Sequence, residues 1–153
     1  MRRGATVIVA VFITVCGLSV VSAHEPNEEL PAGPIRDRHE LMEGIGKNAK
    51  IIGNALKAGD HSPIAAGAEK IQVSAAKITA LFPAGSTHPK SRAKPEIWSN
   101  WEKFEANAKR LQSDAGTLAN VAKNGGDVKG AADTMFEACK SCHDDFRVPE
   151  KKK

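Results

Sequence analysis

Two cysteines followed by a histidine, near the end of the chain, constrain its structure more than any other feature. Cys139, Cys142 and His143 form a Cys-x-x-Cys-His motif. On a helix, residues three or four positions apart share one face, so both thiols and the imidazole can reach a single flat cofactor. The motif is that of a c-type haem attachment site. We therefore expect one haem c, bound covalently through Cys139 and Cys142, with His143 as an axial ligand of the iron.

Other interpretations of the motif are a redox-active cysteine pair, half of a zinc site, or chance. A structural zinc site needs four ligands, and the sequence contains no second Cys-x-x-Cys pair. The third cysteine, Cys16, lies in the apolar N-terminal segment and is expected to leave with it. In an oxidising compartment the two remaining thiols would otherwise form a disulfide. Export and haem attachment therefore support each other.

Residues 1–23 have the organisation of an export signal. Arg2 and Arg3 precede an apolar run, and residues 21–23 (VSA) offer a cleavage site with small side chains. An uncleaved membrane anchor is the alternative, but the apolar run is slightly short for a bilayer span of about 20 residues. We expect cleavage after residue 23, a periplasmic location, and no membrane insertion once the signal is removed.

The charge balance excludes some classes of partner. The formal net charge is +4 at pH 7, from 22 Lys and Arg against 18 Asp and Glu, and loss of the two signal arginines would lower it to +2. Two haem propionates would bring it near zero, so no basic footprint for nucleic acid remains. Residues 151–153, all lysine, are interpreted as a solvated tail, with partner docking as the weaker alternative. Residues 24–34, acidic and with three prolines, are expected to form a flexible leader.

Residues 35–150 are expected to form one all-α domain. Apolar residues recur there at steps of three and four, the pattern of helices with one buried face. The expected helices, in chain order, are residues 35–56, 63–82, 95–124 and 127–147, with Ser62 and Asp127 as the caps of the second and fourth. Four amphipathic helices with short connections fold most simply as an antiparallel four-helix bundle.

The inner faces of these helices can be read from the same periodicity. The first carries Arg38, Met42, Ile45, Ala49, Ile52 and Leu56, and the second carries Ile64, Ala68, Ile71, Ala75, Ile78 and Phe82. Both tryptophans, Trp98 and Trp101, fall on the apolar face of the third helix. We interpret them as core residues rather than cofactor contacts, because aromatic side chains at helical spacing usually fill a core.

Three glycines interrupt the first helix. Gly44, Gly46 and Gly53 each lower its helix propensity by about 1 kcal/mol relative to alanine. Two interpretations are open. Either the helix is merely weakened, or a bulky group such as haem approaches its backbone closely.

The second axial position of the iron decides the function. Methionine, a second histidine or an open position are the common alternatives. Met1 leaves with the signal, and Met135 lies on the same helix as His143 and cannot easily reach the far face. We therefore expect Met42 to be the second iron ligand. The alternatives are that Met42 only covers an open iron position, or that His39 replaces it.

Three further residues are expected to contact the cofactor. Arg38 could pair with a haem propionate through its bidentate guanidinium, and a solvated position at the helix start is the alternative. Phe146 is expected to pack on the proximal face of the haem. Arg147 could tune the proximal pocket or interact with the negative end of its helix. Asp144 and Asp145 are expected to be surface carboxylates.

Three segments resemble one known family. Residues 139–147 (CKSCHDDFR) at the end of the chain resemble the haem motif of the class II c-type cytochromes, the cytochrome c′ family. Residues 94–99 (KPEIWS), followed by Phe104, resemble the start of that family's third helix. Arg38, four residues before Met42, is similar to its first-helix pattern. The resemblance covers nearly all of the chain after the signal.

The resemblance implies a left-handed four-helix bundle, one covalent haem and a bacterial periplasmic setting. High-spin members of the family leave the sixth iron position open, bind nitric oxide or carbon monoxide and often form dimers. Low-spin members place a methionine of the first helix on the iron. Residues 40–48 (ELMEGIGKN) look more like the low-spin branch, and Asp37 stands where many high-spin members have an aromatic residue.

We therefore expect a monohaem cytochrome that carries electrons between redox partner proteins by Fe(III)/Fe(II) cycling, with His143 and Met42 as axial ligands. No substrate is transformed, so the protein is not expected to be an enzyme. The competing hypothesis is a high-spin cytochrome c′ that binds nitric oxide or carbon monoxide at an open site. A homodimer through the first two helices is possible, although their exposed faces are polar.

Overall fold

The computed structural model describes residues 30–149. The expected signal peptide, most of the expected leader and the lysine tail lie outside these residues. The described part contains four long helices: α1 (Pro34–Ala58), α2 (Ile64–Ala75), α4 (Trp101–Asn124) and α5 (Val128–Phe146). A 3₁₀ helix, η1 (Thr79–Leu81), follows α2, and a short helix, α3 (Glu96–Ser99), precedes α4. Within residues 30–149 extended pairing is limited to an isolated bridge between Ala93 and Arg147.

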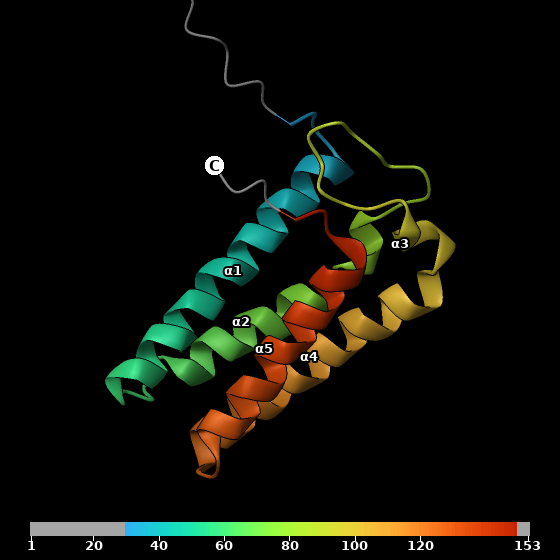
Figure 1. Ribbon diagram of the computed structural model, residues 1–153. Coiled ribbons are helices and arrows are strands. Elements are labelled where there is room, and N and C mark those ends of the chain that lie inside the picture. Colours follow the sequence, from blue (N-terminus) through green and yellow to red (C-terminus); the bar gives the residue numbers. More distant parts are fainter. Residues whose placement is uncertain (1–29, 150–153) are drawn as a thin grey trace, which may run out of the picture.

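The four long helices form a bundle in which neighbours along the chain pack together (Figure 1). α2 packs against both α1 and α4, and α4 packs against α5, whereas α1 and α5 make few direct contacts. The start of α1, the end of α5 and the loop of residues 83–95 lie at the same end of the bundle (Figure 1). This arrangement confirms the expected all-α four-helix bundle, and it leaves the first and last helices separated at that end.

The sequence explains both ends of α1. Pro34 stands in the first turn, where its missing N–H costs nothing. Gly59 ends the helix at φ +70°, a left-handed conformation that favours glycine. The expected range of 35–56 is therefore confirmed to within two residues. Its predicted inner face is also confirmed, because Arg38, Ile45 and Ile52 are buried and Met42, Ala49 and Leu56 pack against the core.

The second helix differs from its prediction at both ends. Ser62 does not cap it; its backbone N–H donates to the Asp60 carboxylate at 3.0 Å, and Pro63 occupies the cap position. α2 ends at Ala75, and the backbone then tightens into i→i−3 hydrogen bonds, such as Ile78 N–H to Ala75 O at 3.1 Å. Helix ends often tighten in this way. The inner face survives the change, because the six residues expected on it are all buried.

The third expected helix is broken near its start. Asn100 adopts φ −126° and ψ 47°, which separates α3 from α4. Trp98 packs against the core, and its Nε1 donates to the carbonyl oxygens of Phe82 and Pro83 at 3.2 and 3.0 Å. Trp101 is exposed, so its assignment to the core was wrong. The break at Asn100 lies between these two tryptophans.

The last helix begins and ends as its sequence indicates. The Asp127 side chain accepts the N–H of Gly130 at 2.8 Å, as an N-cap does. Gly125, at φ +87°, ends the preceding helix, as the Asn-Gly-Gly run predicts. Arg147 lies just beyond α5 in an extended conformation. In the described region no helix is long and apolar enough to cross a membrane.

Candidate functional site

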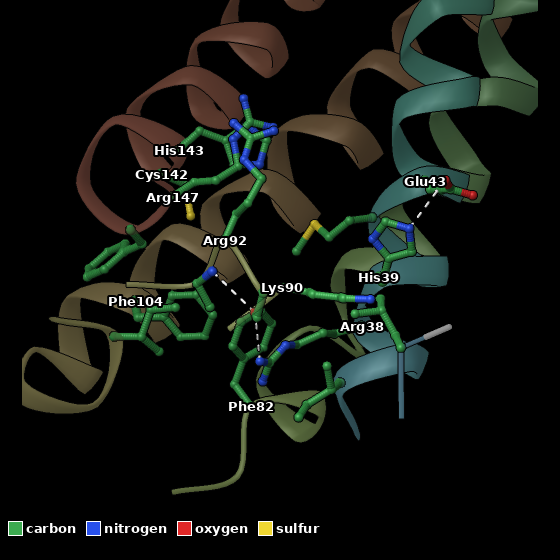
Figure 2. Close-up of a pocket in the computed structure, with 17 residues that line it drawn as sticks. Arg38, His39, Glu43, Phe82, Lys90, Arg92, Phe104, Cys142, His143 and Arg147 are labelled. Carbon is green, nitrogen blue, oxygen red and sulfur yellow. Dashed lines mark hydrogen bonds and ion pairs between the residues drawn. The ribbon is translucent and has the colours of Figure 1, made fainter. Parts of the chain in front are cut away.

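A cavity of about 360 Å³ lies at the end of the bundle where α1 begins and α5 ends. Its size is within the range of about 300–1,000 Å³ that is typical of small-ligand pockets. Its walls come from α1, α3, α4, α5 and the 83–95 loop (Figure 2). The lining residues are Leu30, Ile35, Arg38, His39, Met42, Glu43, Phe82, Lys90, Ser91, Arg92, Ala93, Ile97, Phe104, Cys142, His143, Phe146 and Arg147.

The haem motif supplies the α5 wall of this cavity. Cys142 and His143 line it directly, whereas Cys139 lies one turn earlier on the same helix and packs against the core. Both cysteines are half-buried free thiols. The three motif residues thus lie on the last helix, as predicted, and two of them border the cavity.

The electrostatic environment of the motif favours neutral groups. Burial, followed by the nearby charges of Arg147 and Arg92, lowers the pKa of His143. The imidazole is then neutral near pH 7, and a neutral imidazole is the form that binds a metal. Burial raises the pKa of Cys142 to about 11 and also raises that of Cys139. Reactive cysteines have lowered pKa values, so this environment argues against a redox-active cysteine pair.

Met42 lines the cavity from α1, and His143 lines it from α5. The two residues proposed as iron ligands therefore border one space, although 100 positions separate them in the sequence. Met135, by contrast, is fully buried in the core and is absent from the residues around the cavity. The elimination of Met135 as a distal ligand agrees with this position.

His39 also borders the cavity, at its exposed edge. Its Nε2 lies 3.4 Å from a carboxylate oxygen of Glu43 (Figure 2), and its side chain is 57% exposed. The sequence pattern placed His39 away from the inner stripe of its helix, and its exposure agrees with that. Its position at the cavity nevertheless keeps it as the competing ligand from α1.

Arg38 is buried, with 4% of its surface exposed. One guanidinium nitrogen, Nη1, donates to Ser86 Oγ at 2.8 Å. The other, Nη2, donates to the Ser86 carbonyl at 2.7 Å and to Ser91 Oγ at 2.9 Å. The Arg38 guanidinium also lies over the Phe82 ring, 4.8 Å from its centre. The solvated position that the sequence left open for Arg38 is therefore wrong.

An aromatic row forms part of the cavity wall. The ring centres of Phe82 and Phe104 are 4.9 Å apart, and those of Phe104 and Phe146 are 5.4 Å apart, both in edge-to-face arrangements. All three rings border the cavity. Phe146, which was expected to pack on the haem, thus borders the cavity, and so do Phe104 and Phe82, although the sequence placed Phe82 only on the inner face of its helix.

The charged residues at the end of α5 divide into two groups. Arg147 borders the cavity and is exposed. Asp144 bonds to Lys140 at 2.6 Å and Asp145 pairs with Lys103 at 2.9 Å, which agrees with the prediction that both are surface carboxylates. Sequence reasoning missed the contribution of the 83–95 loop to the cavity, because irregular backbone has no periodicity from which a face can be read.

The donor set around the cavity fits a covalently bound haem. It combines a thiol, a neutral imidazole and a thioether with aromatic rings and several cations. Sulfur and nitrogen are the usual axial ligands of haem iron, apolar rings suit a porphyrin, and cations suit its carboxylates. Among residues 30–149 no group of three His, Cys, Asp or Glu side chains could hold a metal ion by itself.

Comparison with known proteins gives consistent matches. A family model described as cytochrome c′ matches residues 33–147. The chain is 33% identical over 121 residues to cytochrome c-556 of Agrobacterium tumefaciens (strain B2A), which covers 76% of this chain and 98% of that protein. It is 31% identical over 118 residues to cytochrome c′ of Rhodopseudomonas palustris, covering 74% of this chain and 81% of that protein.

Solved structures agree with the sequence matches. Cytochrome c prime from Shewanella frigidimarina superimposes with a TM-score of 0.73 at 26% identity, over 80% of this chain and 100% of that one. Cytochrome c′ from Rhodopseudomonas palustris superimposes with a TM-score of 0.71 at 28% identity, over 79% of this chain and 100% of that one.

Proposed function

The chain belongs to the cytochrome c′ family, and we propose that it is an exported electron carrier whose haem iron is bound by His143 and Met42. Members of this family carry one covalent haem c, and the cysteines at positions 139 and 142 match that attachment. One observation carries the proposal. Met42 from α1 and His143 from α5 border the same cavity.

The haem supplies reversible one-electron chemistry at iron, and the chain sets its properties. Cys139 and Cys142 are proposed to form the thioether links, and His143 to offer a neutral imidazole nitrogen to the iron. A methionine thioether on the other side keeps haem iron low-spin and raises its potential, which suits electron transfer. The wall formed by Phe82, Phe104 and Phe146 limits the access of water to the cofactor.

The proposed setting is the periplasm, where redox partner proteins would deliver and remove electrons. This part of the proposal comes from the export signal in residues 1–23, which lie outside the described residues, and from the family. We propose no chemical transformation of a substrate. The family's haem proteins are carriers rather than classical enzymes.

A gas-binding cytochrome is the second candidate. Relatives bear both names, cytochrome c-556 and cytochrome c′, so the choice rests on what Met42 does in this chain. Met42 is half-buried and borders a cavity. If it only covers an open iron position, nitric oxide or carbon monoxide could bind there.

The optical spectrum of the ferrous protein tests the proposal. We expect sharp low-spin bands that do not change with carbon monoxide, because a bound thioether blocks the sixth position. Met42→Ala removes that ligand and should give a high-spin spectrum that shifts with carbon monoxide. His39→Ala is the matched control on the same helix, and we expect it to leave the low-spin bands unchanged. A wild-type protein that is high-spin and binds carbon monoxide would overturn the proposal in favour of gas binding.

A further inference from the structure

The two helices that border the cavity from opposite ends of the sequence are joined indirectly. α1 and α5 make few direct contacts. Between their cavity ends lies part of the long loop, residues 86–94, which we call the strap. Hydrogen bonds link the strap to α1 on one side and to the end of α5 on the other. The strap therefore links the two walls at this end of the bundle.

The α1 side of the strap is held by one buried side chain. Arg38 donates to Ser86 Oγ, to the Ser86 carbonyl and to Ser91 Oγ at 2.7–2.9 Å. It lies one helical turn before Met42, so the guanidinium ties the turn next to Met42 to the strap. Hydrogen bonds to a charged group are stronger than those between neutral groups, and burial protects these from water.

The α5 side is held by side-chain and backbone contacts. Lys94 Nζ donates to the carbonyls of Asp144 and Asp145 at 2.9 and 3.0 Å, and these are the two residues directly after His143. The Lys94 N–H donates to the Phe146 carbonyl at 3.0 Å. The Val148 N–H donates to the Arg92 carbonyl at 2.8 Å, and Arg92 Nε returns a bond to the Val148 carbonyl at 2.9 Å.

The strap has enough internal structure to transmit a position. The Ser91 N–H donates to the His88 carbonyl at 2.9 Å, and the Lys90 N–H donates to His88 Nδ1 at 3.3 Å. Just before the strap, Trp98 holds the carbonyls of Phe82 and Pro83. These contacts restrict the loop at its entry and middle, which favours transmission of a displacement from one attachment to the other.

We propose that the strap sets the position of Met42 relative to His143, and that Arg38 and Lys94 are positioning residues for the sixth iron ligand. The inference rests on the proposed function, in which Met42 binds the iron. Neither side chain needs to touch the iron. Arg38 fixes the turn of α1 next to Met42, and Lys94 fixes the strap to the turn that follows His143.

The first test weakens the attachment of the strap to α5 in the haem-loaded protein and leaves the backbone bonds of Lys94 and Arg92 in place. Lys94→Met removes the two bonds from Nζ without altering α1, Arg38 or the proposed ligands. We expect hydrogen exchange of the α1 amides around residues 38–42 to accelerate, and the apparent affinity of the ferrous protein for carbon monoxide to rise. Ser113→Ala, at an exposed site on α4, is the control and should change neither quantity.

The second test weakens the attachment of the strap to α1 by removing the two hydroxyl acceptors of Arg38, while Arg38 and its bond to the backbone carbonyl of residue 86 stay in place. In the double variant Ser86→Ala/Ser91→Ala, we expect the apparent carbon monoxide affinity to rise roughly tenfold, because bonds to a charged group are worth at least about that factor in an equilibrium constant. Ser86→Thr/Ser91→Thr keeps both hydroxyls and should restore the wild-type value. Adding Lys94→Met to the alanine pair should give less than the sum of the separate effects, since both sets of substitutions weaken the same strap.

The outcomes separate the two proposals. The wild-type spectrum together with that of Met42→Ala decides whether Met42 binds the iron. The strap is judged by exchange at residues 38–42 in Lys94→Met, which is measured whatever the spin state of the wild type. The strap proposal would be overturned by unchanged α1 exchange in Lys94→Met, or by strictly additive effects of Lys94→Met and the alanine pair. Faster α1 exchange with non-additive effects would support it.

Discussion

The buried guanidinium of Arg38 is held by neutral oxygens rather than by a carboxylate. Its hydrogen-bond acceptors are two serine hydroxyls and one backbone carbonyl, and burial lowers its pKa from the usual value. An arginine nonetheless stays protonated in a protein, so the charge must be stabilised where it lies. Three hydrogen bonds and the face of Phe82 supply that stabilisation. Arg38 can thus order a loop that has no regular structure of its own.

Asp60 offers a test of pH dependence at the scale of one residue. It accepts the Ser62 N–H in the turn between α1 and α2, and hydrogen bonds with Ser62 lower its pKa. A group whose folded pKa is depressed stabilises the protein above its unfolded pKa, near 3.8, and this contribution is lost as pH falls through the folded pKa. We expect the thermal stability of the wild type to drop relative to Asp60→Asn as pH falls below about 4.

Thermal unfolding followed by circular dichroism at several pH values checks this expectation. Asparagine keeps an acceptor oxygen but does not titrate in this range. The difference in melting temperature between the two proteins should therefore be constant at neutral pH and change only in acid. A difference that does not depend on pH would show that the Asp60 carboxylate makes no such contribution.

The site residues that could be predicted are those that belong to a local sequence pattern. The Cys-x-x-Cys-His spacing and the apolar stripe of α1 placed Cys142, His143 and Met42 at one site, and the structure brings them to one cavity. Ser86 and Ser91 could not be found in this way. These serines accept hydrogen bonds from Arg38, which lies about 50 positions away in the sequence. The residues around them in the sequence give no sign of that contact.

Helical elements were predictable on their buried faces and less so at their interruptions. The burial of an apolar stripe depends on many residues together. The predicted inner face of the second helix was therefore confirmed, although its backbone changes from α to 3₁₀ after Ala75. A break depends on one or two residues. Asn100 separates α3 from α4. Because helices tolerate asparagine, its presence in the sequence does not predict a break.

The glycines of α1 allow a test at the scale of one helix. A Cβ added at Gly44, Gly46 or Gly53 would meet no atom within 4 Å, and none of the three borders the cavity. The interpretation that they admit a bulky cofactor therefore lacks support. We expect each Gly→Ala change to stabilise the protein by about 0.5–1 kcal/mol through helix propensity and to leave the optical spectrum unchanged.

Gly67 on α2 is the matched contrast. It is buried, and a Cβ there would lie 3.1 Å from Ile52 Cγ1 on α1. Gly67→Val should destabilise the protein by about 1–3 kcal/mol, because a branched side chain overpacks the contact between the two helices. Denaturant unfolding of the four variants measures both effects. Loss of the haem spectrum in an α1 Gly→Ala variant would instead restore the close-approach interpretation.

The whole molecule divides into a continuous core and a cavity end. α1, α2, α4 and α5 share one hydrophobic cluster along the bundle, yet α1 and α5 make few direct contacts. At the cavity end the two helices are linked by the strap. We expect the cofactor to have a structural role in addition to its chemical one, because a haem attached through α5 would fill the cavity between α1 and α5.

Removal of haem attachment tests this structural role. Cys139→Ala/Cys142→Ala prevents formation of the thioether links. We expect its melting temperature to fall by about 10 °C or more, because loss of a group packed between helices resembles a large core truncation of about 2–5 kcal/mol, and about 1 kcal/mol corresponds to several degrees in a domain of this size.

The location of the loss is the sharper measurement. Hydrogen exchange should accelerate in the first half of α1 and at the end of α5, whereas the contact between α2 and α4, which does not depend on the cavity, should keep its protection. Wild-type protein produced without haem attachment is the control. It differs from the haem-loaded wild type only in the cofactor, so it should behave like the double variant. Equal stability and equal α1 exchange with and without haem would contradict the structural role and would leave the strap and the α2 interface as the complete support of α1.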